Sequence, residues 1–516
     1  MSKSSPNYFF PTWTRGILLL IFLLASYSKA SGQTFSPDQL KEDFAIYKQG
    51  IYEVHPAPFQ WYPRDSFDVW LADIEAQLVR PFTEMEFRKL LFPVHQKLGC
   101  GHSRVRPSSK RIKREKKLYK KGASRWFLPF EAKVYSGRIY ITKDHTPDSL
   151  LEVGTELIAL NGLPAKALID SLTLFFTSDG YNTTHFNRGI NRQFSALHRA
   201  FFGEQFEYFL DLRDSIGNTR SLTLAARVRT RSLDKQEKKE KQRNRKVEPA
   251  KETKVSDKPA EKKLIITKKR YKLFQAEADS ALFILRIPSF AGKKGIRFYK
   301  KCFKYLNQLP FPTELILDLR NNGGGSAKES TTLISMLLDK PFTMEARGYQ
   351  HIPRPIFKHL SIGKWGRDYN KFMFGLRGKK SIDSDTLTYT FKRDPHKKYQ
   401  YKGPVYLFND GYTFSASTLV GAYLQDAGRS KALGEETGGG QFGTNALSMP
   451  HLILPNSDLK IRMPQWRLVH HINGQDQGRG IFPDFPVSEK IEDFLSGSDP
   501  YLKALFIWRK DAQLSD

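Results

Sequence analysis

Apolar residues recur at helical spacing near the start of the chain. Residues 36–39 (Ser-Pro-Asp-Gln) form a capping box with proline at the first helical position, and a 4-3-4-3 stripe follows it: Leu40, Phe44, Tyr47, Ile51 and Val54. A second stripe begins after Asp65. A third is capped by Thr83 and ends at residues 99–102 (Gly-Cys-Gly-His), where the glycines permit a sharp turn. This pattern predicts a helical domain over residues 33–105.

Short strand-like segments replace the helical stripes from about residue 126. Residues 138–142, 206–212 and 221–226 each carry a strand pattern. Residues 151–162 resemble the signature of a PDZ domain, with a turn glycine, a strand and a closing Asn-Gly. We therefore predict a PDZ-like β-rich domain over residues 126–228, with a generic small β domain as the alternative.

Strands alternate with helices from about residue 272 to residue 495, which is typical of an α/β core. Two buried strands each lead into a turn and then a helix: one comes before the glycines at 323–325, the other before Ser415. We predict an α/β domain over residues 264–500 and a C-terminal tail over 501–516.

The first 32 residues have the pattern of a signal peptide. Lys3 and Arg15 precede an apolar run of nine residues, 17–25, and small residues suited to cleavage follow near Gly32. Nine residues are too few to cross a bilayer as a helix. We expect residues 1–32 to be removed and the protein to be exported to the periplasm or exterior of a bacterial cell. An uncleaved anchor is the alternative.

The net charge of +30 is concentrated in two places. Residues 106–121 hold nine Lys/Arg and one Glu, and residues 227–270 hold eighteen Lys/Arg and seven Asp/Glu. Residues 229–263 also lack apolar periodicity. We predict a basic connector over 106–125 and a disordered charged linker over 229–263. The charge favours weak association with an anionic envelope surface. A binder of anionic surfaces or nucleic acid is an alternative function, and no specific nucleic-acid partner is expected.

The cysteine and histidine patterns exclude several classes. Two cysteines, Cys100 and Cys302, are too few for a disulfide scaffold or a zinc finger. They are most simply buried, although a disulfide between them stays open. The chain has no His-Glu-x-x-His sequence. We predict neither a metal site nor a cofactor.

Two strand-turn-helix motifs carry candidate chemistry. Residues 318–326 (Asp-Leu-Arg-Asn-Asn-Gly-Gly-Gly-Ser) let backbone N–H groups approach a ligand closely, as an oxyanion site requires, but lack the Gly-Lys-Ser/Thr of a P-loop. Residues 413–417 (Thr-Phe-Ser-Ala-Ser) place Ser415 at a helix start, where developing negative charge is favoured. A simple N-cap is the commoner role for such a serine.

Together these motifs resemble the serine peptidases of the C-terminal processing peptidase and tricorn protease family. Residues 434–440 and 480–484 follow in the family's order. The resemblance implies a multi-domain α/β protein with an N-terminal helical domain, a PDZ-like domain and a crotonase-like (ClpP/crotonase) catalytic domain. It also implies a polypeptide substrate.

The family activates its serine in two ways. Processing peptidases use a lysine about 25 residues after the serine, but that position is Gly440, and the nearest lysine, Lys431, lies nine residues earlier. The tricorn-like branch uses a histidine from an upstream domain and a Thr-x-Gly-Gly element, which residues 437–440 fit. His102, at the end of the helical domain, stands where that branch has its catalytic histidine. The alternative is that His102 is a structural residue that caps the C-terminus of a helix. The reserve bases are His470 and His471.

The resemblance assigns roles to individual residues. Ser415 is the nucleophile that forms an acyl-enzyme, and His102 is the general base. The N–H groups of Ala416 and of Gly323 or Gly324 form the oxyanion hole. Two positions depart from the family: Gly101 stands where a serine precedes the histidine, and Gln477 stands where a glutamate orients it. We expect Gln477, or Asp476 beside it, to take that orienting role. A catalytically silent peptide- or lipid-binding protein of the same fold is the alternative.

Overall fold

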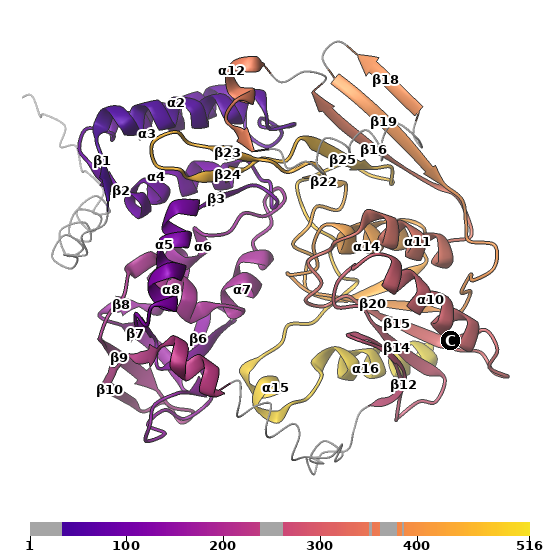
Figure 1. The fold of residues 1–516 in the computed structure, drawn as a ribbon. Helices are drawn as coiled ribbons and strands as arrows, with labels where there is room; N and C mark the ends of the chain where they lie inside the picture. Colours follow the sequence, from indigo (N-terminus) through magenta and orange to yellow (C-terminus); the bar gives the residue numbers. More distant parts are fainter. Residues whose placement is uncertain (1–32, 238–261, 350–352, 362–378, 384–385, 516) are drawn as a thin grey trace, which may run out of the picture.

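The computed structural model describes residues 33–237, 262–349, 353–361, 379–383 and 386–515. The predicted signal peptide and residues 238–261 of the predicted linker lie outside these ranges. Within them the chain forms several helical and β layers, which confirms the predicted multi-domain α/β class (Figure 1).

Three helices build the N-terminal region at the predicted places: α2 (Pro37–Glu53), α3 (Arg64–Ala76) and α4 (Glu84–Lys97). Ser36 and Thr83 both form the capping boxes expected from the sequence. The core of this region includes Leu452, Ile461 and Met463, which come from a hairpin of the C-terminal half. That hairpin consists of β23 (His451–Ile453) and β24 (Lys460–Arg462), and β24 pairs with β3 (Arg104–Arg106).

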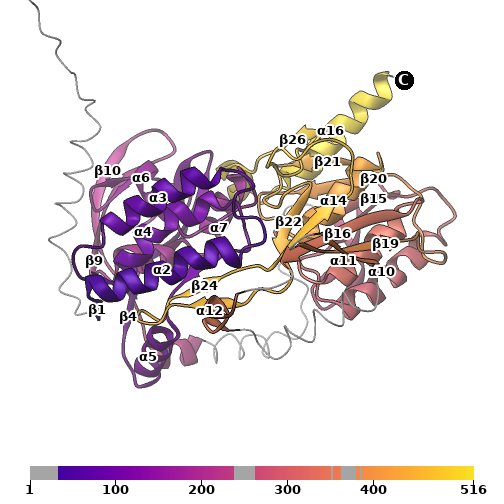
Figure 2. The same cartoon turned by 90° about the horizontal axis from the view of Figure 1, so that it is seen from above.

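The basic stretch after β3 is a helix, α5 (Ser109–Lys120), rather than only a connector. The Ser108 side chain accepts a hydrogen bond from Arg111 N–H, which caps its start. None of its residues is buried, and it projects from the N-terminal half in Figure 2. Long basic side chains are good helix formers, so this stretch is helical without a packed apolar face.

A curved antiparallel sheet with three covering helices follows. Its strands are in the order β10-β9-β7-β6-β5, and β8 pairs with β7. The strands are β5 (Phe130–Tyr135), β6 (Arg138–Asp144), β7 (Glu156–Leu160), β8 (Leu163–Pro164), β9 (Glu207–Arg213) and β10 (Thr219–Ala225). The helices are α6 (Ala165–Thr173), α7 (Thr184–Asn191) and α8 (Phe194–Phe202). The Asn161-Gly162 pair has positive φ at both residues, which suits the tight β7–β8 turn.

The C-terminal half is centred on a seven-stranded sheet in the order β12-β13-β14-β15-β20-β21-β26. The strands are β12 (Lys262–Lys268), β13 (Tyr271–Ala276), β14 (Leu282–Arg286), β15 (Glu314–Asp318), β20 (Val405–Asn409), β21 (Ser430–Gly434) and β26 (Phe485–Pro486). From β14 to β26 neighbouring strands are parallel. The helices that cover one face are α10 (Lys293–Leu306), α11 (Ala327–Leu337) and α14 (Ala416–Asp426) (Figure 1).

The other face of this sheet is covered by α16 (Pro500–Ser515), in the stretch that the sequence assigned to a C-terminal tail. Tyr501, Leu502 and Leu505 are buried there among side chains that include Phe408 and Leu433. An open sheet face exposes apolar side chains to water unless a helix covers it, and burial of these three residues removes that cost.

A second, antiparallel sheet lies beside α14 in the order β18-β19-β16-β25-β22. Its strands are β16 (Phe342–Tyr349), β18 (Lys379–Asp383), β19 (Thr386–Arg393), β22 (Gly443–Ala446) and β25 (Trp466–His470). Cys100 and Cys302 are both buried and free, as the sequence suggested. Among the described residues, no helix has the length and apolarity needed to cross a membrane.

Candidate active site

Ser415 lies in a tight turn between β20 and α14. Its backbone has φ 57° and ψ −121°, a left-handed conformation that costs a non-glycine residue free energy and that recurs at nucleophilic serines. The residue occupies the N-cap position, but within the described chain its hydroxyl makes no cap bond to the helix. The strained turn leaves the hydroxyl free to face another part of the molecule.

That other part is His102, which lies between α4 and β3. Its Nε2 is 3.1 Å from Ser415 Oγ, across 313 positions of sequence. The side chain is buried, and burial lowers the pKa of His102 to about 3, with further lowering by Arg462 and Arg104. The ring is therefore neutral at physiological pH and can accept a proton at Nε2.

Phe414 explains why a glycine precedes this histidine. The rings of Phe414 and His102 lie 4.8 Å apart between centroids, and a Cβ atom on Gly101 would overlap the Phe414 ring. The family's serine therefore does not fit at this position. Ser103 is turned away, with its hydroxyl donating to Arg462 O (2.7 Å) and lying 2.9 Å from His95 Nε2.

The second ring nitrogen of His102 faces β22. Its Nδ1 is 3.1 Å from Thr444 Oγ1. Gln477 is exposed, and Asp476 accepts a hydrogen bond from Arg467 (2.9 Å). The structure thus brings Thr444, rather than either of the two residues favoured by the sequence, to Nδ1. Thr444 belongs to no motif, so no local signal marks it.

The glycine turn after β15 reaches the nucleophile. Gly324 has φ +94°, and a Cβ atom there would lie 2.8 Å from Ser415 Cβ and 3.0 Å from Ala416 N. Only glycine permits this approach. The N–H of Gly324 donates to Asn322 Oδ1 (2.9 Å), whereas Gly323 lies against the Tyr412 ring.

The two downstream motifs close around the same turn. A Cβ atom on Gly439 would lie 2.9 Å from Ser415 N, and Gly480 N–H donates to Glu436 Oε1 (2.8 Å). Lys431 is 59% exposed and its Nζ lies 3.8 Å from Asp484. It therefore pairs with a carboxylate and does not serve as the general base for Ser415.

The two reserve histidines lie in other environments. His470 Nδ1 is 2.6 Å from Gln441 O, and His471 Nε2 is 3.3 Å from Glu345. A third histidine, His185, stacks on Tyr412 and lies near Phe414, where burial lowers its pKa to about 4. The sequence analysis did not single out His185.

Residues 282–487 match the sequence profile described as Peptidase family S41. This part of the chain is a peptidase family S41 domain. It is a serine peptidase, and its substrates are polypeptides. The structure of mature CPAF is similar over 89% of this chain and 94% of its own, with a TM-score of 0.60 at 16% identity. Mature CPAF complexed with lactacystin is similar over 92% and 98%, with a TM-score of 0.62 at 16% identity. At this identity the likeness shows a shared fold.

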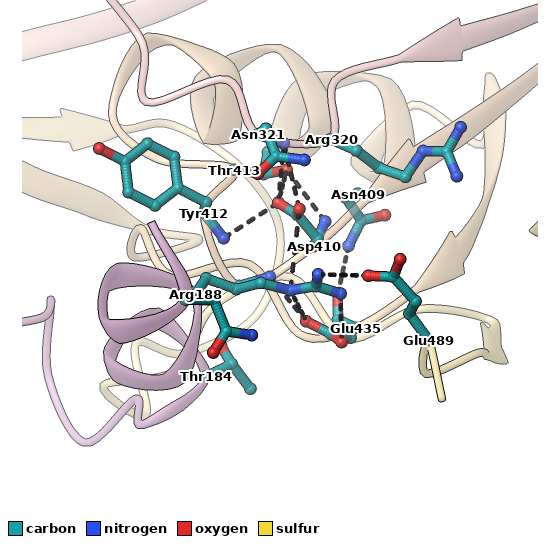
Figure 3. Close-up of polar contacts among 12 residues, drawn as sticks. Thr184, Arg188, Arg320, Asn321, Asn409, Asp410, Tyr412, Thr413, Glu435 and Glu489 are labelled. Carbon is teal, nitrogen blue, oxygen red and sulfur yellow. Dashed lines mark hydrogen bonds and ion pairs between the residues drawn. The ribbon is translucent and has the colours of Figure 1, made fainter. Parts of the chain in front are cut away.

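A further contact between the two halves of this serine peptidase is shown in Figure 3. Arg188 on α7 contacts three carboxylates of the C-terminal half: Glu435 at 2.6 Å, Glu489 at 3.1 Å and Asp410 at 3.9 Å. Burial opposes the Arg188 charge, but Glu435 and Asp410 outweigh it and hold its pKa above the usual range.

Asp410 connects this ion cluster to both catalytic motifs. Its carboxylate accepts hydrogen bonds from Asn321 N–H (3.1 Å) in the glycine turn and from Tyr412 N–H (3.0 Å) before Ser415 (Figure 3). Burial raises the pKa of Asp410, and Arg188 opposes that rise. Arg188 thus supports the residue that joins the two turns.

Proposed function

We propose that this S41 peptidase is an endopeptidase that acts through an acyl-enzyme on Ser415 with His102 as general base. The observation that carries the proposal is the 3.1 Å separation of His102 Nε2 and Ser415 Oγ, which is hydrogen-bonding distance. A neutral ring supports it, because a base must begin without the proton it accepts.

The reaction follows from this pair. Ser415 Oγ attacks the peptide carbonyl carbon as its proton passes to His102 Nε2. The C–N bond then breaks as His102 returns that proton to the leaving amine. Water, deprotonated by His102, attacks the acyl carbon, and the proton returns to Ser415 Oγ as the ester bond breaks.

The oxyanion of each tetrahedral intermediate needs backbone donors. We assign the N–H of Ala416, which begins α14, together with that of Gly323 or Gly324. Gly324 N–H would have to leave Asn322 Oδ1 to take part. Loss of one such donor costs about 10²- to 10³-fold in kcat.

The test is a fluorophosphonate probe and a fluorogenic peptide, offered to the mature chain, Ser415→Ala and Ser417→Ala. We expect labelling and turnover by the parent and by Ser417→Ala, the matched control, and neither by Ser415→Ala. Equal turnover by all three would refute the assignment. Peptide binding without labelling of the parent would favour the catalytically silent alternative.

The β-rich region supports a PDZ-like role in this proposal. Its sheet ends at β5 on one side and β10 on the other, and an extended peptide can add to a sheet edge as a further strand. We propose that it binds the C-terminal end of a substrate. A peptide should then bind more tightly with a free carboxylate than as its amide; equal affinity would contradict the role.

Export and surface association complete the proposal. If the signal peptide is removed, N-terminal sequencing of the secreted protein should give a sequence that begins near Gln33.

Helix α5 carries exposed lysines that suit an anionic lipid surface, each contributing about 1 kcal/mol to binding. Neutralising Lys113, Lys116 and Lys117 to Gln should weaken binding to phosphatidylglycerol vesicles. The same change at the exposed α10 residues Lys293, Lys301 and Lys304 is the matched control, and equal loss in both would contradict a role specific to α5.

A further inference from the structure

We propose that Thr444 and Asp179 are positioning residues that set the tautomer of His102. The inference rests on the proposed function, because it concerns how the proposed base is prepared. Neither residue belongs to a motif that the sequence analysis singled out.

Asp179 lies among hydrogen-bond donors in the interior, with 2% of its surface exposed. Its Oδ1 accepts from Gly101 N–H (2.9 Å), next to His102, and its Oδ2 accepts from Gly440 N–H (3.2 Å) at the end of the Thr-x-Gly-Gly element. Burial raises the pKa of Asp179, whereas Gly101 N–H, the Thr444 hydroxyl as a side-chain hydrogen-bond partner, Gly440 N–H and the charge of Arg467 lower it. An ionised carboxylate has no proton to donate, so Asp179 accepts a hydrogen bond from each of these donors.

Thr444 lies between Asp179 and the histidine, and its exposed fraction is 3%. A threonine hydroxyl has one proton to donate and lone pairs to accept with. Because the carboxylate of Asp179 takes that proton, Thr444 Oγ1 can only accept at its 3.1 Å contact with His102 Nδ1. The ring proton must therefore reside on Nδ1.

The consequence for Ser415 follows at once. With the proton on Nδ1, Nε2 presents a lone pair to the Ser415 hydroxyl 3.1 Å away. The opposite tautomer would place an N–H there and could not accept the proton. When the ring becomes an imidazolium, the Asp179 charge stabilises it through Thr444. The chain of contacts does the work that a carboxylate beside the histidine does elsewhere.

The decisive variant is Thr444→Val, which keeps the side-chain shape and removes the hydroxyl. We expect kcat to fall by about 10²-fold with KM little changed, because the wrong tautomer costs about 10⁴-fold where the carboxylate bonds the histidine directly. Thr444→Ser, which keeps the hydroxyl, should restore kcat to within a few fold. Thr313→Val is the matched control for loss of a buried threonine hydroxyl, since Thr313 bonds Tyr401 instead.

The tautomer itself is read by ¹⁵N NMR of histidine-labelled protein, with the His102 signals identified from His102→Gln. The parent should show Nδ1–H at His102. Asp179→Asn should shift it toward Nε2–H, because the amide can donate to Thr444 Oγ1 and reverse the chain of bonds.

Two results would overturn the inference: Nε2–H in the parent, or a Thr444→Val enzyme with kcat within twofold of the parent. Should Thr444→Val fail to fold, the Asp179→Asn and Thr444→Ser spectra and rates decide in its place. The NMR measurement does not require turnover, so it separates failure of the positioning role from failure of the proposed function, which the Ser415 probe tests.

Discussion

Two of the polar contacts that join the N-terminal half of the molecule to the S41 domain are electrostatic opposites. At His102–Ser415 both partners are neutral, because burial lowers the pKa of the histidine. At Arg188 a cation is surrounded by three carboxylates, which hold its charge. The first contact can exchange a proton and the second cannot. The comparison indicates that one set of side chains transfers the proton and a different set holds the two halves together.

The largest expected effect breaks the neutral contact. His102→Ala should lower kcat by about 10⁴-fold or more, since loss of the base in a comparable triad costs up to about 10⁶-fold. The unfolding midpoint should fall moderately, because the truncated ring leaves a cavity beside Phe414 but no unpaired charge. Steady-state kinetics and thermal unfolding of the same sample check both. Unchanged kcat would contradict the role of His102 as base.

Breaking the ionic contact should act on stability instead. Arg188→Met leaves three carboxylates without their cation, which should destabilise the fold by about 3–5 kcal/mol. Arg64→Met removes an exposed pair with Asp68 and should cost at most about 1 kcal/mol. Urea unfolding of both variants tests this. Equal losses would show that the Arg188 cluster is not a structural attachment.

Gly101→Ala tests the packing of the neutral contact. The added methyl group overlaps the Phe414 ring, so the ring or the His102 backbone must move. We expect a loss of about 1–3 kcal/mol in stability and a larger fractional loss in kcat than in 1/KM. Gly137→Ala is the comparison for strain without a clash, since a Cβ atom there meets open space but φ is +77°, whereas Gly101 has no positive φ. Wild-type kcat in Gly101→Ala would argue against tight positioning.

The pH dependence of stability sharpens the electrostatic difference. His102 has a folded-state pKa of about 3 against about 6.5 when unfolded, so the unfolded state binds more protons between these values. Stability should therefore rise with pH through this window and be lost as pH falls below about 6.5. His102→Gln should reduce the slope by about 1.4 kcal/mol per pH unit. Urea titrations between pH 4 and pH 6 measure it, and identical slopes would contradict a neutral buried ring.

The smallest effect is expected at Gln477. Because its side chain is exposed and Thr444 occupies Nδ1 of His102, Gln477→Ala should change kcat by less than about twofold. A loss of tenfold or more would restore the orienting role that the sequence suggested for Gln477. Kinetics at saturating peptide distinguish these results.

Local patterns predicted much of the fold. The capping boxes at Ser36 and Thr83 and the stripes behind them correspond to α2 and α4, because caps and apolar spacing act within one or two turns of helix. The sequence analysis predicted a C-terminal tail where the structure has α16, a helix that packs against the core. Its buried residues contact a sheet face that only the folded domain presents.

The candidate site divides in the same way. Ser415 and the glycine turn follow from sequence, since each strand-turn-helix motif sets its own backbone and a positive φ at Gly324 requires glycine. His102 came from resemblance rather than from physics, and Thr444 and Asp179 carry no local mark. Their partners lie tens to hundreds of positions away, at separations that no periodicity encodes.

By itself, the sequence determined the helices, the principal strands, the two catalytic turns and the absence of a lysine at the family position. These depend on residues close together in the chain. Only the tertiary structure decided that His102 meets Ser415, that Thr444 lies at Nδ1, and that Arg188 meets three carboxylates of the other half. Each of these contacts joins residues more than two hundred positions apart, so it exists only once the two halves have packed together.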